Sequence, residues 1–217
     1  MNVPADDVRR EIRKTLIRLA QKQQKLGTGS GLDFLRRRTA RVAWPDLAPV
    51  LGGIPWAVVG AVATRRYMAE RATLDIDFAV RTADAGETRA RLRAAGFTYE
   101  GELSIGGALW RAPDGGRVDV LEVAEPWLCS GIVQAAQNRD PQGLPVLPLP
   151  ELVLMKYRAG RLQDTADVGR MLGQADERAI EGVRALFARE AQAEMEDLES
   201  LIRLGKLELQ GPGDPGG

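Results

Sequence analysis

Two aspartates, Asp75 and Asp77, lie two residues apart in the segment RATLDIDFAV, residues 71–80. The residues around them are mostly apolar, and several are β-branched or aromatic, which predicts a strand. Side chains alternate between the two faces of a strand, so the two carboxylates share one face and the apolar side chains share the other. Such a pair either faces water or faces a positively charged group, and other parts of the sequence must distinguish these readings.

A third aspartate, Asp119, lies in the segment RVDVLEV, residues 117–123, between two valines that point to the opposite face. If this segment pairs with residues 74–80, three carboxylates share one sheet face and repel each other unless a cation lies among them. Mg²⁺ prefers oxygen ligands, and a pair of such ions supports in-line phosphoryl chemistry. Asp75, Asp77 and Asp119 are therefore candidate metal ligands, and exposed strand and hairpin positions are the alternative.

The segment that precedes the two aspartates offers a place for a phosphate group. IPWAVVG, residues 54–60, predicts a short buried strand that ends at Gly60, and AVATRRYMAE, residues 61–70, predicts a helix. A strand that leads into a helix leaves free backbone N–H groups at the helix N-terminus, where phosphate binds readily. A close turn without a ligand is the alternative interpretation of Gly60.

The expected elements give an α/β (α+β) core between helical flanks. Periodicity predicts a helix at 6–26, and start and stop signals predict helices at 32–43 and 83–96. We expect a strand at 73–80 and a hairpin with a PDGG turn within 108–123. The segment 144–172 begins extended and becomes helical, and helices follow to about residue 205. We expect an N-terminal helical arm (1–45), a core with a small mixed sheet (46–125), a C-terminal helical part (126–208) and a disordered tail (209–217).

Composition excludes several kinds of chemistry. The 217 residues carry no net charge, no histidine and one cysteine, Cys129. Zinc sites with histidine ligands, Ser-His or Cys-His nucleophiles and an internal disulfide are therefore excluded. The N-terminus lacks the apolar centre of a signal peptide, and no apolar stretch approaches the length of a membrane span. We expect a cytoplasmic protein without a membrane partner.

The charges are unevenly distributed along the chain. Residues 1–45 carry eleven basic and four acidic side chains, 11 − 4 = +7, and three of the arginines are consecutive, Arg36, Arg37 and Arg38. Such an arm is either a footprint for the phosphate backbone of a nucleic acid or a solvated helix surface that pairs with the acidic C-terminal helices.

Together, these segments resemble the nucleotidyltransferase superfamily related to DNA polymerase beta. The family pattern is a strand, a Gly-Gly or Gly-Ser turn, a helix, an Asp-x-Asp strand and a third Asp on a later strand. It corresponds here to VVGAVATRRYMAERATLDIDFAV and GGRVDVLEV. The closer resemblance, over roughly residues 54–172, is to the AbiEii-type branch, which includes toxin nucleotidyltransferases, through RATLDID and LMKYRAGRLQDTADV. The chain departs from the pattern at Ala61, which follows Gly60, and at Gln163, where a basic residue is often seen.

The resemblance implies roles for individual residues. Asp75, Asp77 and Asp119 would hold Mg²⁺, with Mn²⁺ as an alternative, and Asp119 would act as base toward the attacking hydroxyl. The other implied contacts are with the nucleoside triphosphate. They come from Gly60, Ala61, Thr64, Arg65 and Lys156, with Asp164 and Asp167 as the later aspartates of the pattern; Arg66 and Arg71 are further candidates. Asp164 and Asp167 are better explained as ionic partners of Lys156 or an arginine than as metal ligands.

Three functions remain open at this level. The resemblance favours transfer of a nucleotide to RNA, above all to the 3′ end of tRNA, by the toxin of a toxin–antitoxin or abortive-infection system with a cognate antitoxin protein. The second is transfer to a small molecule, such as an antibiotic hydroxyl, or to a protein side chain. The third is a degenerate domain that binds nucleotide, RNA or a partner protein without turnover.

Overall fold

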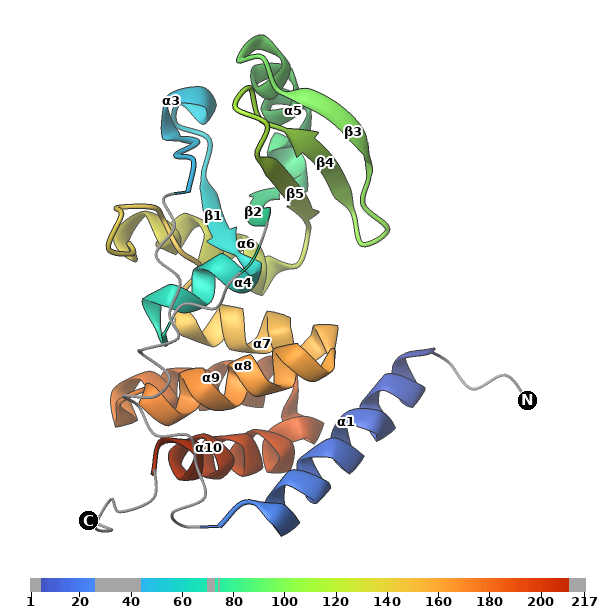
Figure 1. Cartoon of the computed structure of the whole chain (residues 1–217), viewed down its shortest axis with the longest axis vertical. Helices are drawn as coiled ribbons and strands as arrows, with labels where there is room; N and C mark the ends of the chain where they lie inside the picture. Colours follow the sequence, from blue (N-terminus) through green and yellow to red (C-terminus); the bar gives the residue numbers. More distant parts are fainter. Residues whose placement is uncertain (1–4, 26–43, 70–72, 74, 211–217) are drawn as a thin grey trace. The chain divides into compact units, whose positions relative to one another are not determined.

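The computed structural model describes residues 5–25, 44–69, 73 and 75–210 (Figure 1). The chain divides into two compact units, which we describe separately. The helical unit comprises Met1–Thr39, Tyr67–Ala69 and Leu152–Gly217, and the sheet unit comprises Ala40–Arg66 and Glu70–Glu151. Within the described ranges, no helix is both long enough and apolar enough to cross a membrane.

The sheet unit contains a five-stranded mixed sheet. Its strands are β1 (Trp56–Val59), β2 (Asp75–Arg81), β3 (Thr98–Glu102), β4 (Gly107–Arg111) and β5 (Arg117–Val123), in the spatial order β1-β2-β5-β4-β3. β2 and β5 are parallel, and the other neighbouring strands are antiparallel. The helices of this unit are α3 (Ala48–Leu51), α4 (Gly60–Ala63), α5 (Ala85–Ala94) and α6 (Pro126–Gln134). The expected α/β class with a small mixed sheet is confirmed.

One face of the sheet is the core of this unit. Ile76 and Phe78 of β2, Val120 of β5 and Trp110 of β4 are almost completely buried. In β2 and β5 these positions alternate with Asp75, Asp77 and Asp119, as expected for a half-buried sheet. α5 packs on this face, where the guanidinium of Arg93 lies 5.5 Å from the ring centre of Trp110. The aspartates of β2 and β5 therefore lie on the other face.

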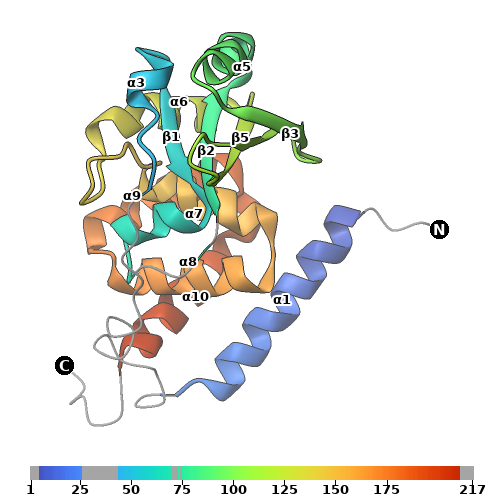
Figure 2. The same ribbon diagram turned by 45° about the horizontal axis from the view of Figure 1, so that its top comes forward.

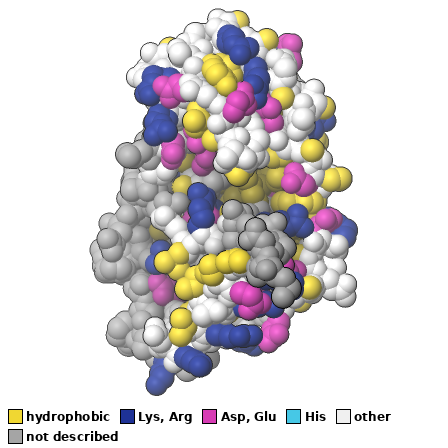
Figure 3. Space-filling model, turned by 90° about the vertical axis from the view of Figure 1, so that its right-hand side faces the viewer, with side chains coloured by type: hydrophobic (Ala, Val, Ile, Leu, Met, Phe, Trp, Pro, Cys, Tyr) yellow, Lys and Arg dark blue, Asp and Glu magenta, His cyan; other side chains and the backbone are white. Residues whose placement is uncertain are grey.

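The helical unit contains α1 (Ala5–Gln23), most of α7 (Leu149–Ala159), α8 (Leu162–Gln174), α9 (Glu177–Glu190) and α10 (Met195–Leu209). α8 and α10 lie side by side in both ribbon views (Figures 1 and 2). Glycines allow this close approach, because a Cβ on Gly205 would lie 1.9 Å from the carbonyl oxygen of Gly169. α1 packs on α10. Figure 3, drawn from the side on which α1 lies, shows hydrophobic side chains at the surface among charged ones.

The structure corrects several expected elements. The helix expected at 61–70 is wrong in length: α4 ends at Ala63, and Thr64–Arg66 tighten into a 3₁₀ turn. Arg65 in that turn is held by Asp140, which fixes the direction of the chain there. β3 was not predicted from the sequence, although it forms one edge of the sheet. The expected helix at 32–43 and residues 211–217 of the expected tail lie outside the described residues.

Candidate active site

The three aspartates lie on one face of the sheet because of the register between β2 and β5. Asp77 is the direct partner of Asp119, and Asp75 is the partner of Arg117. Paired residues of neighbouring strands project to the same side of a sheet. The strand pairing on which the metal-site hypothesis depended is therefore present, and all three carboxylates are half-buried.

Asp119 is the most unusual of the three carboxylates. Its Oδ1 atom is buried and has no hydrogen-bond partner in the part of the chain that the structure describes. Burial raises the pKa of Asp119, the negative charge of Asp75 raises it further, and Arg117 opposes both effects. A buried carboxylate oxygen without a donor is costly, so this atom is a natural ligand for a cation or an acceptor for a proton.

Asp77 lies against the turn that follows β1. Gly60 has φ +63°, and a Cβ at this position would lie 1.8 Å from Oδ2 of Asp77. Only glycine meets both requirements, because it tolerates positive φ and leaves room for the carboxylate. The expected helix N-terminus is reduced to the four residues of α4, so the structure provides a tight glycine turn in its place.

Asp75 is oriented by a neighbouring hydroxyl. Thr73 donates a hydrogen bond of 2.7 Å from Oγ1 to Oδ1 of Asp75. Within the described residues, no three acidic or cysteine side chains are gathered closely enough to enclose a metal ion. The site nevertheless fits a divalent cation of the Mg²⁺ type, which usually takes one or two protein carboxylates and completes its shell with phosphate oxygens and water. The partnerless oxygen of Asp119 beside the charge of Asp75 is the observation that supports this fit.

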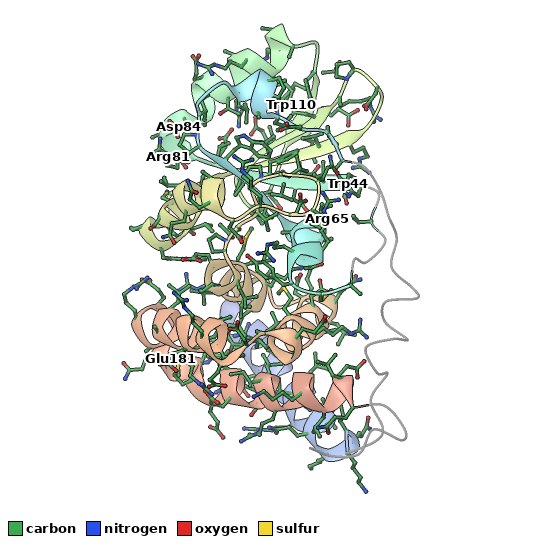
Figure 4. The ribbon with its side chains drawn as sticks, turned by 90° about the vertical axis from the view of Figure 1, so that its left-hand side faces the viewer. Trp44, Arg65, Arg81, Asp84, Trp110 and Glu181 are labelled. Atoms are coloured by element: carbon green, nitrogen blue, oxygen red, sulfur yellow. The ribbon has the colours of Figure 1, made fainter. Side chains whose placement is uncertain are left out.

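The structure gives internal roles to two of the expected nucleotide contacts. Thr64 is fully buried, and its hydroxyl donates to the carbonyl of Ala61 at 2.7 Å. Arg65 forms an ion pair with the buried carboxylate of Asp140 and donates to Gln142 at 3.1 Å. Figure 4 shows Arg65 beside α4 near Trp44, whose backbone N–H donates to the same Gln142 side chain. A phosphate contact is therefore not supported for either residue. Arg66 is exposed, and Arg71 lies outside the described residues.

The remaining candidates form a buried ionic cluster in the helical unit. Nζ of Lys156 lies 3.1 Å from Asp164 and 2.8 Å from Asp167, and all three residues are at most 3% exposed. Arg161 donates to the other oxygen of Asp164 at 2.6 Å. Burial raises the pKa of Asp164, but the hydrogen bond from Arg161 and the charge of Lys156 outweigh this effect and lower it. The carboxylates are thus partners of Lys156 and an arginine, as the sequence indicated.

Arg117 was not among the residues predicted from the sequence. This residue precedes Asp119 by two positions, so it projects from the same face, and its neighbours across the sheet are Asp75 and Arg111. Its side chain is exposed and makes no hydrogen bond or ion pair with any residue that the structure describes. The Arg-x-Asp spacing in RVDV was the available signal. On the same face of the sheet, two residues further along the strands, Asp119 pairs with Asp77 of β2 on one side and with the half-buried Leu109 of β4 on the other.

Comparisons with known proteins found no matching family model and no matching curated protein. Among solved structures, the chain is similar to the crystal structure of ANT(2″)-Ia in complex with adenylyl-2″-tobramycin. The TM-score is 0.42 and the identity 18%, over 69% of this chain and 87% of that chain. It is also similar to the solution structure of the antibiotic-resistance factor ANT(2″)-Ia. The TM-score and identity are the same, over 69% of this chain and 82% of that chain.

Proposed function

We propose that this chain is a nucleotidyltransferase that uses a divalent cation, Mg²⁺ or Mn²⁺, to transfer a nucleotide from a nucleoside triphosphate to a hydroxyl of an acceptor. The observation that carries the proposal is the buried, partnerless Oδ1 of Asp119 on the sheet face that also presents Asp75 and Asp77. A surface Asp-x-Asp pair would be solvated, and its neighbour across the sheet would not be a desolvated carboxylate with a raised pKa.

The residues of this face have different roles in the proposed reaction. Asp75, Asp77 and Asp119 would hold the cation, which when bound would neutralise the charge of the triphosphate and polarise the reacting phosphorus. Asp119 accepts the proton of the attacking hydroxyl, and its raised pKa suits this role. The hydroxyl oxygen forms a bond to the α-phosphorus, the bond from that phosphorus to the bridging oxygen breaks, and pyrophosphate leaves. The backbone of the Gly60–Ala61 turn contacts the triphosphate.

We propose RNA, and above all the 3′ end of tRNA, as the acceptor. Arg117 supports an anionic acceptor, because it places an exposed cation without an ionic partner in the described residues beside the three carboxylates. Phosphate groups are bound by such side chains through charge and paired hydrogen bonds. A role as the toxin of a two-protein system, with an antitoxin as its partner, belongs to this proposal.

The decisive experiment identifies both the acceptor and the metal requirement. The protein is incubated with each labelled nucleoside triphosphate, Mg²⁺ or Mn²⁺, and total RNA, and the label is followed into RNA, small molecules and protein. Label in RNA that depends on the metal and disappears in Asp77→Ala supports the proposal, with Glu196→Gln as an exposed acidic control on α10.

Other outcomes point to the alternatives. Label that enters a small molecule or a protein side chain in a lysate moves the function to the second class of acceptor. Binding of nucleotide without metal-dependent release of pyrophosphate would identify a domain that binds without turnover, and it would overturn the proposal.

A further inference from the structure

The first helix of the chain, α1, is apolar on two faces. On its inner face, Ile17 is 3% exposed, and Arg13 donates to the carbonyl of Tyr157 at 2.8 Å while its guanidinium lies 3.9 Å from the centre of that ring. Arg10 on the same side forms an ion pair of 3.1 Å with Glu194. These contacts anchor α1 within the helical unit and account for its inner face.

The outer face carries large apolar side chains that this unit does not cover. Val8 is 45% exposed, Ile12 is 52% exposed and Leu19 is 49% exposed. The intervals of four and seven residues place all three on one stripe of the helix, with Thr15 between them. An apolar stripe of this kind on a charged helix is typical of a surface that docks another helix.

The charges beside the stripe indicate what that other helix is. Glu11 lies toward the N-terminal end of one flank, and Arg18 and Lys22 lie toward its C-terminal end. All three are exposed and form no ion pair with any described residue. In a parallel two-fold pair this flank would face the other flank of the partner helix, whereas an antiparallel pair sets the flank against its own copy and brings Glu11 of one helix beside the basic residues of the other.

We propose that a second copy of this chain docks on the stripe, so that the two α1 helices pack antiparallel about a two-fold axis at Thr15. Leu19 lies four residues, about 6 Å, beyond the axis, while Val8 and Ile12 lie about 10.5 Å and 4.5 Å before it. Leu19 of the second copy therefore enters between Val8 and Ile12. The interface is isologous and closes at a dimer.

The same register also matches the charges. Glu11 lies about 6 Å before the axis, and Arg18 and Lys22 lie about 4.5 Å and 10.5 Å beyond it. Glu11 of each copy thus falls between the two basic side chains of the other, on both sides of the axis. Three apolar side chains per copy make a small interface, so we expect a dissociation constant on the order of 10 µM.

Sedimentation equilibrium of the full chain, from about 1 µM to about 200 µM, tests the dimer over a range that brackets this constant. We expect a monomer–dimer equilibrium that Ile12→Glu or Leu19→Glu abolishes. Ile105→Glu is the matched control, because Ile105 is 76% exposed on the β3–β4 hairpin, outside the stripe. Circular dichroism confirms that each variant is folded. A wild-type monomer over the whole range, or a dimer that persists in Ile12→Glu, overturns the proposal.

Two further measurements test the register. Glu11→Lys should weaken the dimer at least tenfold, and the added changes Arg18→Glu and Lys22→Glu should restore it. In a Cys129→Ser background, Thr15→Cys should cross-link to its copy with a short bifunctional maleimide. Gln23→Cys should not, since eight residues on each side of the axis separate the two thiols by about 24 Å. Cross-linking at Gln23 but not at Thr15 would overturn the antiparallel arrangement.

Discussion

Asp77 and Gly60 fit together so closely that no side chain can take the place of the glycine. The carboxylate of Asp77 lies where a Cβ of residue 60 would be, with Oδ2 1.8 Å from that point. Gly60 is also held at φ +63°, where side chains are strained. The turn after β1 and one of the candidate metal ligands are therefore coupled through direct contact.

We expect Gly60→Ala to reduce the free energy of unfolding by about 2–4 kcal/mol, because it adds a steric clash to the backbone strain. Nucleotide transfer should be lost even at temperatures where the variant is folded, since Asp77 must move. Gly53→Ala is the matched control, because Gly53 also has positive φ, +89°, but no atom lies within 4 Å of the point that its Cβ would occupy. Urea titration and transfer assays on both variants make the comparison. Equal losses in the two variants would show that the contact with Asp77 has no importance.

The raised pKa of Asp119 predicts how stability depends on pH. At pH values between the ordinary pKa of 3.8 and the raised pKa of Asp119, the folded protein binds more protons at this carboxyl than the unfolded chain does. This group therefore makes the free energy of unfolding fall as the pH increases. In the absence of metal, Asp119→Asn should therefore raise the melting temperature at pH 7. This gain in melting temperature should vanish at a pH below the ordinary pKa of 3.8, where the carboxyl of Asp119 is neutral in both the folded and the unfolded state.

Thermal melts with EDTA across this pH range provide the measurement. Adding Mg²⁺ should stabilise the wild type more than Asp119→Asn, because the cation replaces the missing partner of the carboxylate. If Asp119→Asn is less stable than the wild type at pH 7 without metal, burial and repulsion by Asp75 do not explain the raised pKa of Asp119.

Lys156 is expected to contribute to stability through Asp164 and Asp167. Lys156→Met leaves two carboxylates buried without their shared cation, which should cost about 3–5 kcal/mol of unfolding free energy. Arg161→Ala should cost less than about 1 kcal/mol, because that side chain is 76% exposed. Changing both aspartates to Asn together with Lys156→Met should recover much of the loss.

Denaturant unfolding of these variants is paired with the KM for the nucleoside triphosphate. The restored variant should keep the wild-type KM if the cluster is purely structural. A KM that stays raised after stability returns would instead support the phosphate contact that the resemblance implies for Lys156.

Arg117 is expected to bind the acceptor. Arg117→Ala should raise the KM for RNA and lower the slope of log K against log salt by about one for a lost phosphate contact, with little change in KM for the nucleoside triphosphate. Arg178→Ala, an exposed arginine on α9, should change neither quantity. Kinetics at several salt concentrations measure both effects, and an unchanged acceptor KM would remove Arg117 from the site.

The local patterns of the sequence were sufficient for the strands that carry the aspartates. Alternation in DIDF and VDVL assigned Asp75, Asp77 and Asp119 to the faces opposite their apolar neighbours, and β2 and β5 confirm this alternation. The helical periodicity of α1 and of the C-terminal helices was also readable, and Asp84 and Gly96 marked the start and the stop of α5. In α1 the residues that set this periodicity include Val8, Ile12 and Leu19, which are exposed. The segment 98–102 escaped prediction, since as an edge strand it is largely exposed and carries a glycine.

Only the tertiary structure decided which charged residues are occupied by other parts of the chain. Arg65 and Thr64 follow the glycine turn and resemble phosphate contacts in sequence, yet a distant carboxylate, Asp140, and a local carbonyl hold them. Arg117 attracts no notice in the sequence, yet the parallel register brings it beside Asp75. The alternation of side chains is a property of the local backbone and can be read from neighbouring residues. Ionic partners and strand registers join residues far apart in the chain, so they are fixed only when the whole fold forms.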